Sequence, residues 1–303
     1  MAESRCRAHG RPVPAELVGP LVDSSALAGT PGALADRLAE DGYLFLRQAL
    51  PAALATAARH RVLERLAAVG EVVDPAGAAR ATGDSRREEL EPDRGAFWQS
   101  VSEQPAMRAV THGPELVSLM SELFGEPARP FDFVFLRPAV NGRHTDIHCD
   151  KPFFTRRTER VVTCWIALGE VPVERGPLFV VEGSHRWPDV RAAVQGYDVA
   201  RDSGRRNALE ENPADYAARR GTRLLTADFK PGDMVVFGMY LLHGAFDNHA
   251  TDGGIRLSCD VRFQPVGDPE DPRYFGAQPT GTTGAGYGEL NGAKPLNEAW
   301  HQR

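Results

Sequence analysis

The stretch Asn141-Gly-Arg-His-Thr-Asp-Ile-His-Cys-Asp-Lys-Pro-Phe-Phe154 holds two His-x-Asp triplets within seven residues, just after a run typical of a β-strand. In an extended segment residues i and i+2 point the same way, so His148 and Asp150 can offer an imidazole and a carboxylate to one small ion. A third ligand must come from elsewhere, and the best candidate is His243, which follows the strand-like run 233–237. Two imidazoles and one carboxylate form the ligand set of non-heme Fe(II) oxygenases.

Composition limits the classes of protein to which the chain can belong. With 303 residues, 42% of them hydrophobic, it can bury a large core. A formal charge of −6 disfavours a nucleic-acid partner. Because no run of 18 apolar residues and no apolar leader occurs, we expect no membrane segment and a cytoplasmic protein. The cysteines lack C-x-x-C spacing, and we expect reduced thiols at Cys6, Cys149, Cys164 and Cys259.

The order of patterns along the chain predicts helices first and strands afterwards. Apolar residues at helical spacing, with Pro at starts and Gly at ends, predict helices at 31–41, 51–69, 105–111 and 114–124. Apart from a short strand at 43–46, the predicted strands follow, at 131–136, 160–168, 178–181, 223–226, 234–237 and 255–263. This order favours a mainly β fold of the sandwich or jelly-roll type, with the N-terminal helices packed on one sheet.

The segments outside this pattern divide the chain. Residues 1–30 read as an N-terminal arm on the surface, and residues 31–267 as a single domain. Within that domain, 71–96 reads as a loop and the polar stretch 188–222 as a lid-like insertion. The Gly-, Pro- and Thr-rich residues 268–303 are expected to form a C-terminal tail that packs on the domain.

The predicted strand at 255–263 has two distinct faces. Leu257 and its alternating neighbours are apolar, whereas Arg256, Ser258 and two further polar residues share the other face. An edge strand with a solvent-exposed face explains this pattern, and so does a guanidinium and hydroxyl that hold a carboxylate inside a barrel. Trp165 and Thr163 likewise share one face of the strand at 160–168, where core packing of Trp165 is the simpler explanation.

Taken together, these motifs resemble those of the phytanoyl-CoA dioxygenase family of Fe(II)/2-oxoglutarate-dependent oxygenases. The shared motifs occur in the family's order, over about residues 33–264: Asp41 to Arg47, His148 to Phe154, Thr163 to Trp165, Gly176 to His185, Lys230 to Asp233, His243-Gly244 and Arg256 to Ser258. The resemblance implies a double-stranded β-helix fold, with iron held by His148, Asp150 and His243. It also implies that Arg256, assisted by Ser258, binds the distal carboxylate of 2-oxoglutarate beside Trp165 and Thr163.

Two other histidines compete for the ligand positions. His144-Thr-Asp146 is a second possible metal pair, but the aromatic pair Phe153-Phe154 follows the later triplet, as in the family. His185 stands in a Gly-Ser-His turn that the family uses structurally. The carboxylate at Asp150 also counts against halogenation, because related halogenases have a small residue there.

The resemblance further implies the type of reaction. Fe(II) and O2 would decarboxylate 2-oxoglutarate to succinate and CO2 and hydroxylate a C–H bond of a small-molecule metabolite; desaturation or cyclisation would need only a different substrate pose. We expect tailoring of a secondary metabolite, with the oligomeric state left open. Substrate contacts are expected at the rim of the site, from Trp98, Gln99, Arg137, Lys151 and Phe153.

Two rival interpretations remain. One is a cupin-type jelly roll that binds another metal for isomerisation, or that only binds a ligand; it has no need of Arg256 with Ser258. The other is a nucleic-acid demethylase, prompted by the spacing Arg256-x5-Arg262, which also occurs in DNA-repair oxygenases of this superfamily. The acidic composition argues against the second interpretation.

Overall fold

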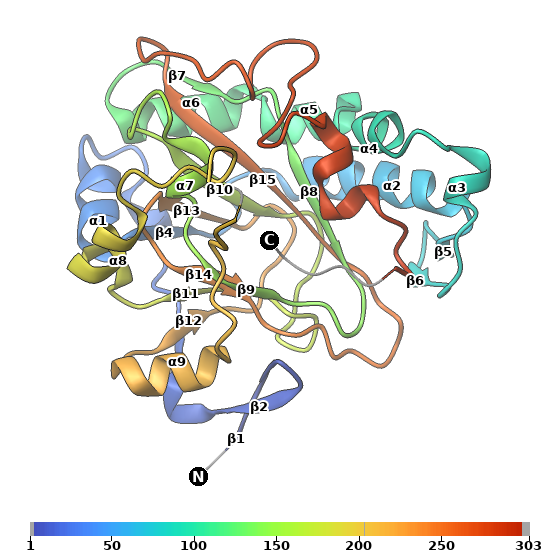
Figure 1. Cartoon of the computed structure of the whole chain (residues 1–303), viewed down its shortest axis with the longest axis horizontal. Coiled ribbons are helices and arrows are strands. Elements are labelled where there is room, and N and C mark those ends of the chain that lie inside the picture. The colour runs from blue at the N-terminus through green and yellow to red at the C-terminus, as the bar shows by residue number, and fades with distance from the viewer. Residues whose placement is uncertain (1–2, 203, 299–303) are drawn as a thin grey trace.

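Two β-sheets form the centre of the protein, in a computed structural model that describes residues 3–202 and 204–298 (Figure 1). The larger sheet has the order β4 (Tyr43–Leu46), β13 (Met234–Gly238), β10 (Val162–Ala167), β15 (Arg256–Pro265) and β7 (Ala128–Pro130), and β8 (Phe135–Ala139) also pairs with β15. The smaller sheet has the order β3 (Val18–Pro20), β12 (Leu224–Thr226), β11 (Leu178–Val181), β14 (His243–Ala245) and β9 (Thr145–His148). This architecture is the expected double-stranded β-helix.

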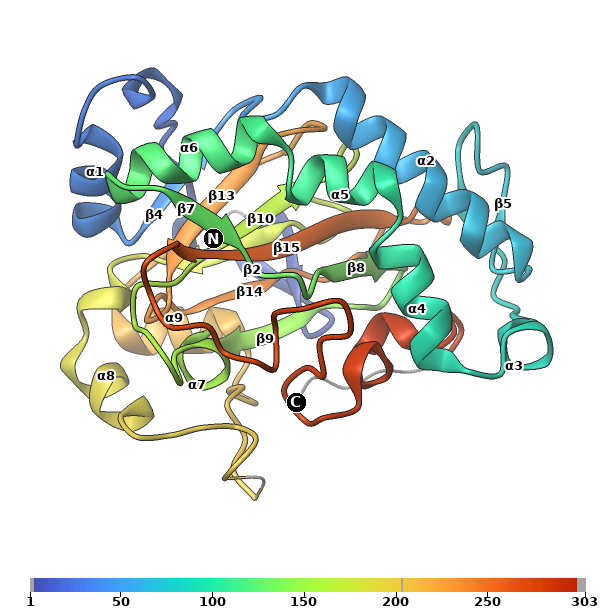
Figure 2. The ribbon, with the colours of Figure 1, turned by 90° about the horizontal axis from the view of Figure 1, so that it is seen from above.

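Helices cover the outer face of the larger sheet (Figure 2). They are α1 (Ala33–Asp41), α2 (Ala52–Ala68), α4 (Arg94–Ser102), α5 (Pro105–Thr111) and α6 (Pro114–Phe124), with the short α3 (Arg87–Leu90) at one end. Their buried apolar residues join those of β4, β13, β10 and β15 in the largest hydrophobic core. The remaining helices, α7 (Lys151–Phe154), α8 (Pro188–Val194) and α9 (Pro213–Arg220), lie beside the smaller sheet and its loops.

Strand β15 is the central strand of the site. Its apolar residues, Leu257 among them, face the helices, and its polar residues face the smaller sheet. All ten residues of β15 are buried, and the strand pairs with β10 on one side and with β7 and β8 on the other. The interpretation as an edge strand with a solvent-exposed face is therefore wrong.

The strand predicted at 131–136 is misplaced. Only residues from Phe135 onward form β8, because the preceding backbone amides bond elsewhere: Phe131 donates to the carbonyl of Arg262, and both Asp132 and Phe133 donate to that of Tyr274. The loop predicted at 71–96 contains the small hairpin β5 (Val72–Val73) and β6 (Arg80–Ala81) as well as α3. Glu71, at the start of this stretch, and Arg87, the first residue of α3, form a fully buried ion pair at 2.6 Å.

The division into arm, domain and tail stays a prediction, but the segments concerned have defined structure. Near the N-terminus, β1 (Glu3–Ala8) and β2 (Arg11–Pro14) form a hairpin, and β3 runs parallel to β12 in the smaller sheet. The 3₁₀ turns η1 (Ala15–Leu17), η2 (Ser25–Leu27), η3 (Ser184–Arg186), η4 (Gly286–Glu289) and η5 (Asn291–Ala293) complete the elements. Among the described residues, no helix combines the length and apolar character needed to cross a bilayer.

Candidate active site

Three side chains converge between the two sheets. His148 ends β9 and His243 begins β14, and the antiparallel register of these strands places the two residues directly opposite each other. Asp150 follows two residues after β9. Its Oδ1 lies 3.8 Å from Nε2 of His148 and 3.9 Å from Nε2 of His243. Two ligands that are each about 2.1 Å from an ion lie roughly 3–4 Å apart, so this group could hold one metal ion.

Burial keeps the imidazoles of His148 and His243 neutral, and hydrogen bonds fix which ring nitrogen carries the proton. Nδ1 of His148 donates to the carbonyl of Asp146 at 2.9 Å, and Nδ1 of His243 donates to that of Leu241 at 3.0 Å. These bonds leave the lone pair on each Nε2, the atom that faces Asp150. Burial lowers the pKa of His148 to about 3, with a further contribution from the neighbouring His243, and burial also lowers the pKa of His243.

The carboxylate of Asp150 is held from behind. Its Oδ2 accepts hydrogen bonds from Oγ1 of Thr163 at 2.6 Å and from Nη2 of Arg262 at 2.9 Å. The guanidinium of Arg262 is buried and lies over the rings of Phe135 and Phe154. Although burial alone would raise the pKa of Asp150, Arg262 and the two histidines lower it well below its ordinary value. The carboxylate is thus ionised, with Oδ1 turned toward the imidazoles.

An inner cavity separates the triad from a buried arginine. Both sheets line it, and its residues include His148, His243, Trp165, Arg137 and Arg256. Arg256 is 2% exposed and donates from Nη1 to the carbonyl of Gly176 at 2.8 Å, while its Nε has no partner among the described residues. Burial, and secondarily Arg137, lower the pKa of Arg256 to about 10. A buried cation with an unused donor favours an anionic ligand in this cavity.

An outer cavity of about 120 Å³ opens on the other side of the triad. His148, Asp150 and Arg262 form its base, and aromatic rings, including Phe153, form one wall. The opposite wall comes from the C-terminal segment and consists of Thr282, Thr283, Glu289, Leu290 and Asn291. Arg137 borders both cavities and forms a close ion pair with Asp260. This place suits a second small molecule next to the metal group.

The structure brings most of the predicted site residues to these cavities, but not all of them. Ser258 is fully buried and its Oγ has no partner within residues 3–202 and 204–298, but it does not line the inner cavity. Trp98 packs in the main core, and neither it nor Gln99 lines a cavity at the triad. Lys151 points instead to Glu159, at 3.8 Å. Thr163 was predicted to lie beside the 2-oxoglutarate carboxylate. It instead donates a hydrogen bond to the Asp150 carboxylate and does not line the inner cavity.

The earlier His-x-Asp triplet lies away from His243. His144 and Asp146 instead form a separate group with His9 of the N-terminal hairpin. The structure therefore gives the later triplet, and not the earlier one, to the group between the sheets.

Some functional candidates escaped sequence reasoning. Arg262 was placed on the correct face of its strand but noted only for its spacing from Arg256. That spacing is explained by an intramolecular contact with Asp150, so it does not support a nucleic-acid substrate. The residues that form the C-terminal wall of the outer cavity lie in a segment without hydrophobic periodicity, so no sequence pattern placed them at the site.

Fold and side chains together define the class: a double-stranded β-helix protein with two histidines and one carboxylate, the ligand set of non-heme Fe(II) oxygenases. A family model described as phytanoyl-CoA dioxygenase (PhyH) matches residues 38–257, and the chain belongs to this family. It is accordingly an Fe(II)/2-oxoglutarate-dependent dioxygenase.

Individual relatives agree with this assignment. The chain is 27% identical to 1-deoxypentalenic acid 11-beta-hydroxylase of Streptomyces exfoliatus over 236 residues, which cover 75% of this chain and 78% of the relative. Two solved enzymes of nogalamycin biosynthesis share the fold. The epimerase SnoN, in complex with Fe3+, alpha ketoglutarate and nogalamycin RO, is 23% identical at a TM-score of 0.53, covering 90% of this chain and 94% of that one. The carbocyclase SnoK is 22% identical at 0.54, covering 83% and 90%.

Proposed function

We propose that His148, Asp150 and His243 bind Fe(II), that Arg256 binds the distal carboxylate of 2-oxoglutarate, and that the enzyme hydroxylates a small secondary metabolite held in the outer cavity. One observation carries the proposal: the two lone-pair nitrogens and Oδ1 of Asp150 meet between the cavities, with the buried Arg256 on one side. The expected cytoplasmic location stays a prediction from the sequence.

The residues present fit both the iron and the co-substrate. The three ligand atoms include two neutral nitrogens and one anionic oxygen, which suits a ferrous ion and leaves coordination positions open. On the co-substrate side, the buried Nε of Arg256 has no partner among the described residues and lies at the inner cavity, where a carboxylate would satisfy it.

When bound, Fe(II) and 2-oxoglutarate use O2 to supply the oxidant for the substrate C–H bond, with release of succinate and CO2. The protein's own residues provide geometry and a dry surrounding. Thr163 and Arg262 hold Oδ2 of Asp150, so the carboxylate presents a single oxygen to the ion. Phe135 and Phe154, together with the C-terminal wall, limit the access of water to the base of the outer cavity.

The outer cavity favours a substrate that is mostly apolar with an anionic or polar end. Phe135, Phe153, Phe154, Val199 and Leu290 supply apolar surface, and the guanidinium of Arg137, paired through Nε with Asp260, supplies polar surface. A relative that hydroxylates 1-deoxypentalenic acid supports an acidic metabolite as the substrate. Hydroxylation is the outcome we propose, and a different pose in this cavity would allow desaturation or cyclisation.

The test is a screen of small acidic metabolites with Fe(II), 2-oxoglutarate and O2, read by succinate formation. We expect succinate with the wild type and none above background with the Asp150→Ala variant. Anaerobic addition of Fe(II) and 2-oxoglutarate should give a weak visible charge-transfer band in the wild type alone. Equal turnover by both proteins would contradict the metal assignment, and absence of the band would favour the cupin-type rival.

A further inference from the structure

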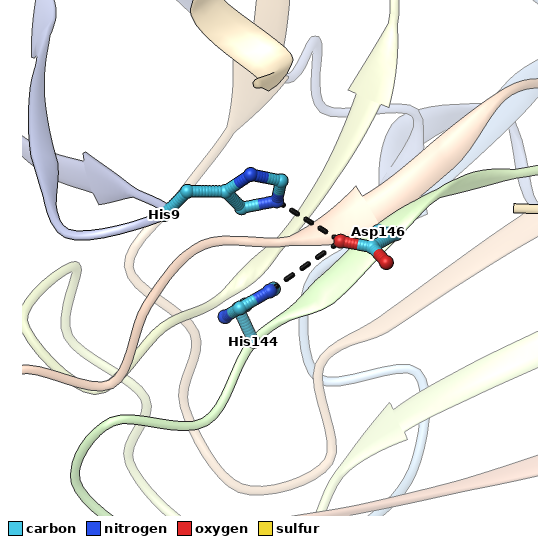
Figure 3. Close-up of side chains that lie close together, drawn as sticks. All are labelled: His9, His144 and Asp146. Atoms are coloured by element: carbon cyan, nitrogen blue, oxygen red, sulfur yellow. Dashed lines mark hydrogen bonds and ion pairs between the residues drawn. The ribbon is translucent and has the colours of Figure 1, made fainter. Parts of the chain in front are cut away.

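A second cluster of metal-binding side chains lies where the N-terminal hairpin meets strand β9 (Figure 3). His9 comes from the turn between β1 and β2, and His144 and Asp146 come from β9 and the residue before it. Oδ1 of Asp146 lies 2.9 Å from Nε2 of His9 and 3.4 Å from Nε2 of His144. One nitrogen or oxygen from each residue lies within 4.8 Å of the others.

We propose that His9, His144 and Asp146 form a second metal site, which binds a divalent transition-metal ion of the zinc or nickel type. Imidazole nitrogens suit these ions, whereas Mg²⁺ and Ca²⁺ favour sites made of oxygen atoms. The site goes beyond the proposed dioxygenase function, because none of its side chains reaches the inner or the outer cavity.

Asp247 fixes the backbone turn that carries His9 and lies beside the ring of His144. Its carboxylate accepts hydrogen bonds from the backbone amides of His9, at 3.0 Å, and Gly10, at 2.6 Å. These bonds fix a turn in which His9 has a φ of 50°, an uncommon value for a residue other than glycine. The same Oδ1 of Asp247 lies 3.5 Å from Nδ1 of His144. A carboxylate behind a ligating imidazole orients the ring and increases its basicity, as at many zinc sites.

The second site is wetter than the first. The side chains of His9 and His144 are 25% and 35% exposed, compared with 13% and 7% for His148 and His243. His144 and Asp146 also line a surface cavity of about 710 Å³, through which an ion can enter. The guanidinium of Arg206 lies 3.6 Å from Oδ2 of Asp146, whereas the two imidazoles face Oδ1.

A metal ion bound by His9, His144 and Asp146 would link the β1–β2 hairpin to strand β9, which also carries His148. Asp146 supplies a carboxylate to the cluster and, through its backbone carbonyl, accepts the hydrogen bond from Nδ1 of His148. A metal ion that binds the folded state but not the unfolded state would stabilise the protein. The role is thus structural support of β9 from outside the catalytic group.

The test counts zinc ions. Tag-free, metal-stripped protein is titrated with Zn(II) by calorimetry, and bound zinc is measured after gel filtration. We expect two equivalents for the wild type and one for each of His9→Gln, His144→Gln and His148→Ala. The double variant His9→Gln/His148→Ala should bind none, and His60→Gln, which alters an exposed histidine paired with Glu64 on α2, should keep two.

The variants also separate the two sites. In His148→Ala, Zn(II) should raise the melting temperature, and adding His9→Gln should abolish that shift. If His9→Gln and His144→Gln both still bind two zinc ions, the second site is wrong. It is also wrong if the wild type binds a single zinc ion and only the His148→Ala variant loses it. If His148→Ala keeps both equivalents while His9→Gln loses one, the second site stands and the proposed iron ligands fail.

Discussion

Asp150 uses its two carboxylate oxygens differently. Oδ2 is held by Thr163 and Arg262, and Oδ1 faces the two imidazoles. Groups that orient a ligand typically change metal affinity by about 10–100-fold when they are removed. The positions of Thr163 and Arg262 therefore matter for iron binding, although neither residue belongs to the proposed ligands.

Replacement of Thr163 should weaken iron binding without disturbing the strand. Thr163→Val keeps the shape and the β-branching but removes the hydroxyl donor, so we expect Fe(II) affinity to fall by about 10-fold. Thr163→Ser keeps the donor and should stay within a few-fold of the wild type. Anaerobic Fe(II) titration checks both variants, and equal affinities for Thr163→Val and Thr163→Ser would contradict the role of the hydroxyl.

Replacement of Arg256 should act on the co-substrate. A lysine lacks the planar fork that binds a carboxylate through two hydrogen bonds, so Arg256→Lys should raise the KM for 2-oxoglutarate by about 10-fold or more. Arg160→Lys, at a half-exposed arginine that pairs with Glu126 and Asp268, is the matched control and should leave this KM unchanged. Initial rates of succinate formation at varied 2-oxoglutarate concentrations give these KM values. An unchanged KM for Arg256→Lys would contradict the proposed role of Arg256 in binding 2-oxoglutarate.

At the scale of elements, helix α1 is followed by Gly42, a position that requires glycine for two reasons: a left-handed backbone and the close approach of another side chain. Gly42 has a φ of 81°, and a Cβ there would lie 2.4 Å from Nδ1 of His185 in η3. Gly125 ends α6 with a φ of 68° and has no atom within 4 Å of such a Cβ. The two helix ends therefore separate the backbone requirement from the steric one.

Alanine at the two helix ends should differ in cost. Gly125→Ala should lower the free energy of unfolding by about 1 kcal/mol, the usual cost of a left-handed backbone for alanine. Gly42→Ala adds a clash with His185 and should cost roughly 1–3 kcal/mol more. Urea denaturation measures both values, and equal losses would show that the contact with His185 is unimportant.

His112, the residue that follows helix α5, is neutral in the folded protein. Burial and the neighbouring Arg108 lower the pKa of His112 to about 4, and Arg108 donates to its Nε2 at 2.6 Å. Because the unfolded chain binds this proton near pH 6.5 and the folded chain only near pH 4, stability should fall as the pH drops through this window. We expect the loss from this residue to reach roughly 1–3 kcal/mol, and His112→Gln should flatten the curve. Urea denaturation between about pH 4 and 7 checks the slope, and identical slopes would contradict the effect.

Local patterns predicted some helices and strands with their observed bounds, among them the strands at 43–46 and 178–181. The helices at 105–111 and 114–124 match their predicted ranges, because Pro begins each of them and Gly113 and Gly125 follow them closely. The predicted strand at 131–136 was wrong in its first part, since its aromatic residues pack against Tyr274 and Tyr287, which lie far away in the sequence. Such partners cannot be read from a local window.

At the scale of the whole molecule, a buried ion pair fastens the C-terminal segment. Arg87, paired with Glu71, donates from Nη1 to the carbonyls of Gly292 and Lys294, at 2.8 and 3.0 Å. This contact spans 205 residues of sequence for Gly292. The triad could be predicted from an ordered set of motifs, but the wall opposite it could not, because its position depends on such distant contacts.

A methyl group at Gly292 should disturb that wall selectively. A Cβ there would lie 2.1 Å from the indole of Trp98, so Gly292→Ala must displace the segment that carries Leu290. Gly288→Ala, whose Cβ would meet only ordinary contacts, is the control. We expect Gly292→Ala to cost about 1–3 kcal/mol and to raise the KM for the metabolite several-fold, with the KM for 2-oxoglutarate unchanged. Hydrogen exchange across 286–296 and the two KM values check this, and unchanged exchange would contradict it.

The wall and the metal group come from different stretches of the chain, 282–291 and 148–243. An exchange of the short C-terminal stretch between relatives would therefore give enzymes that keep one oxidation chemistry and accept different molecules. Natural selection or protein engineering could thus diversify the substrates of this scaffold through residues 282–291.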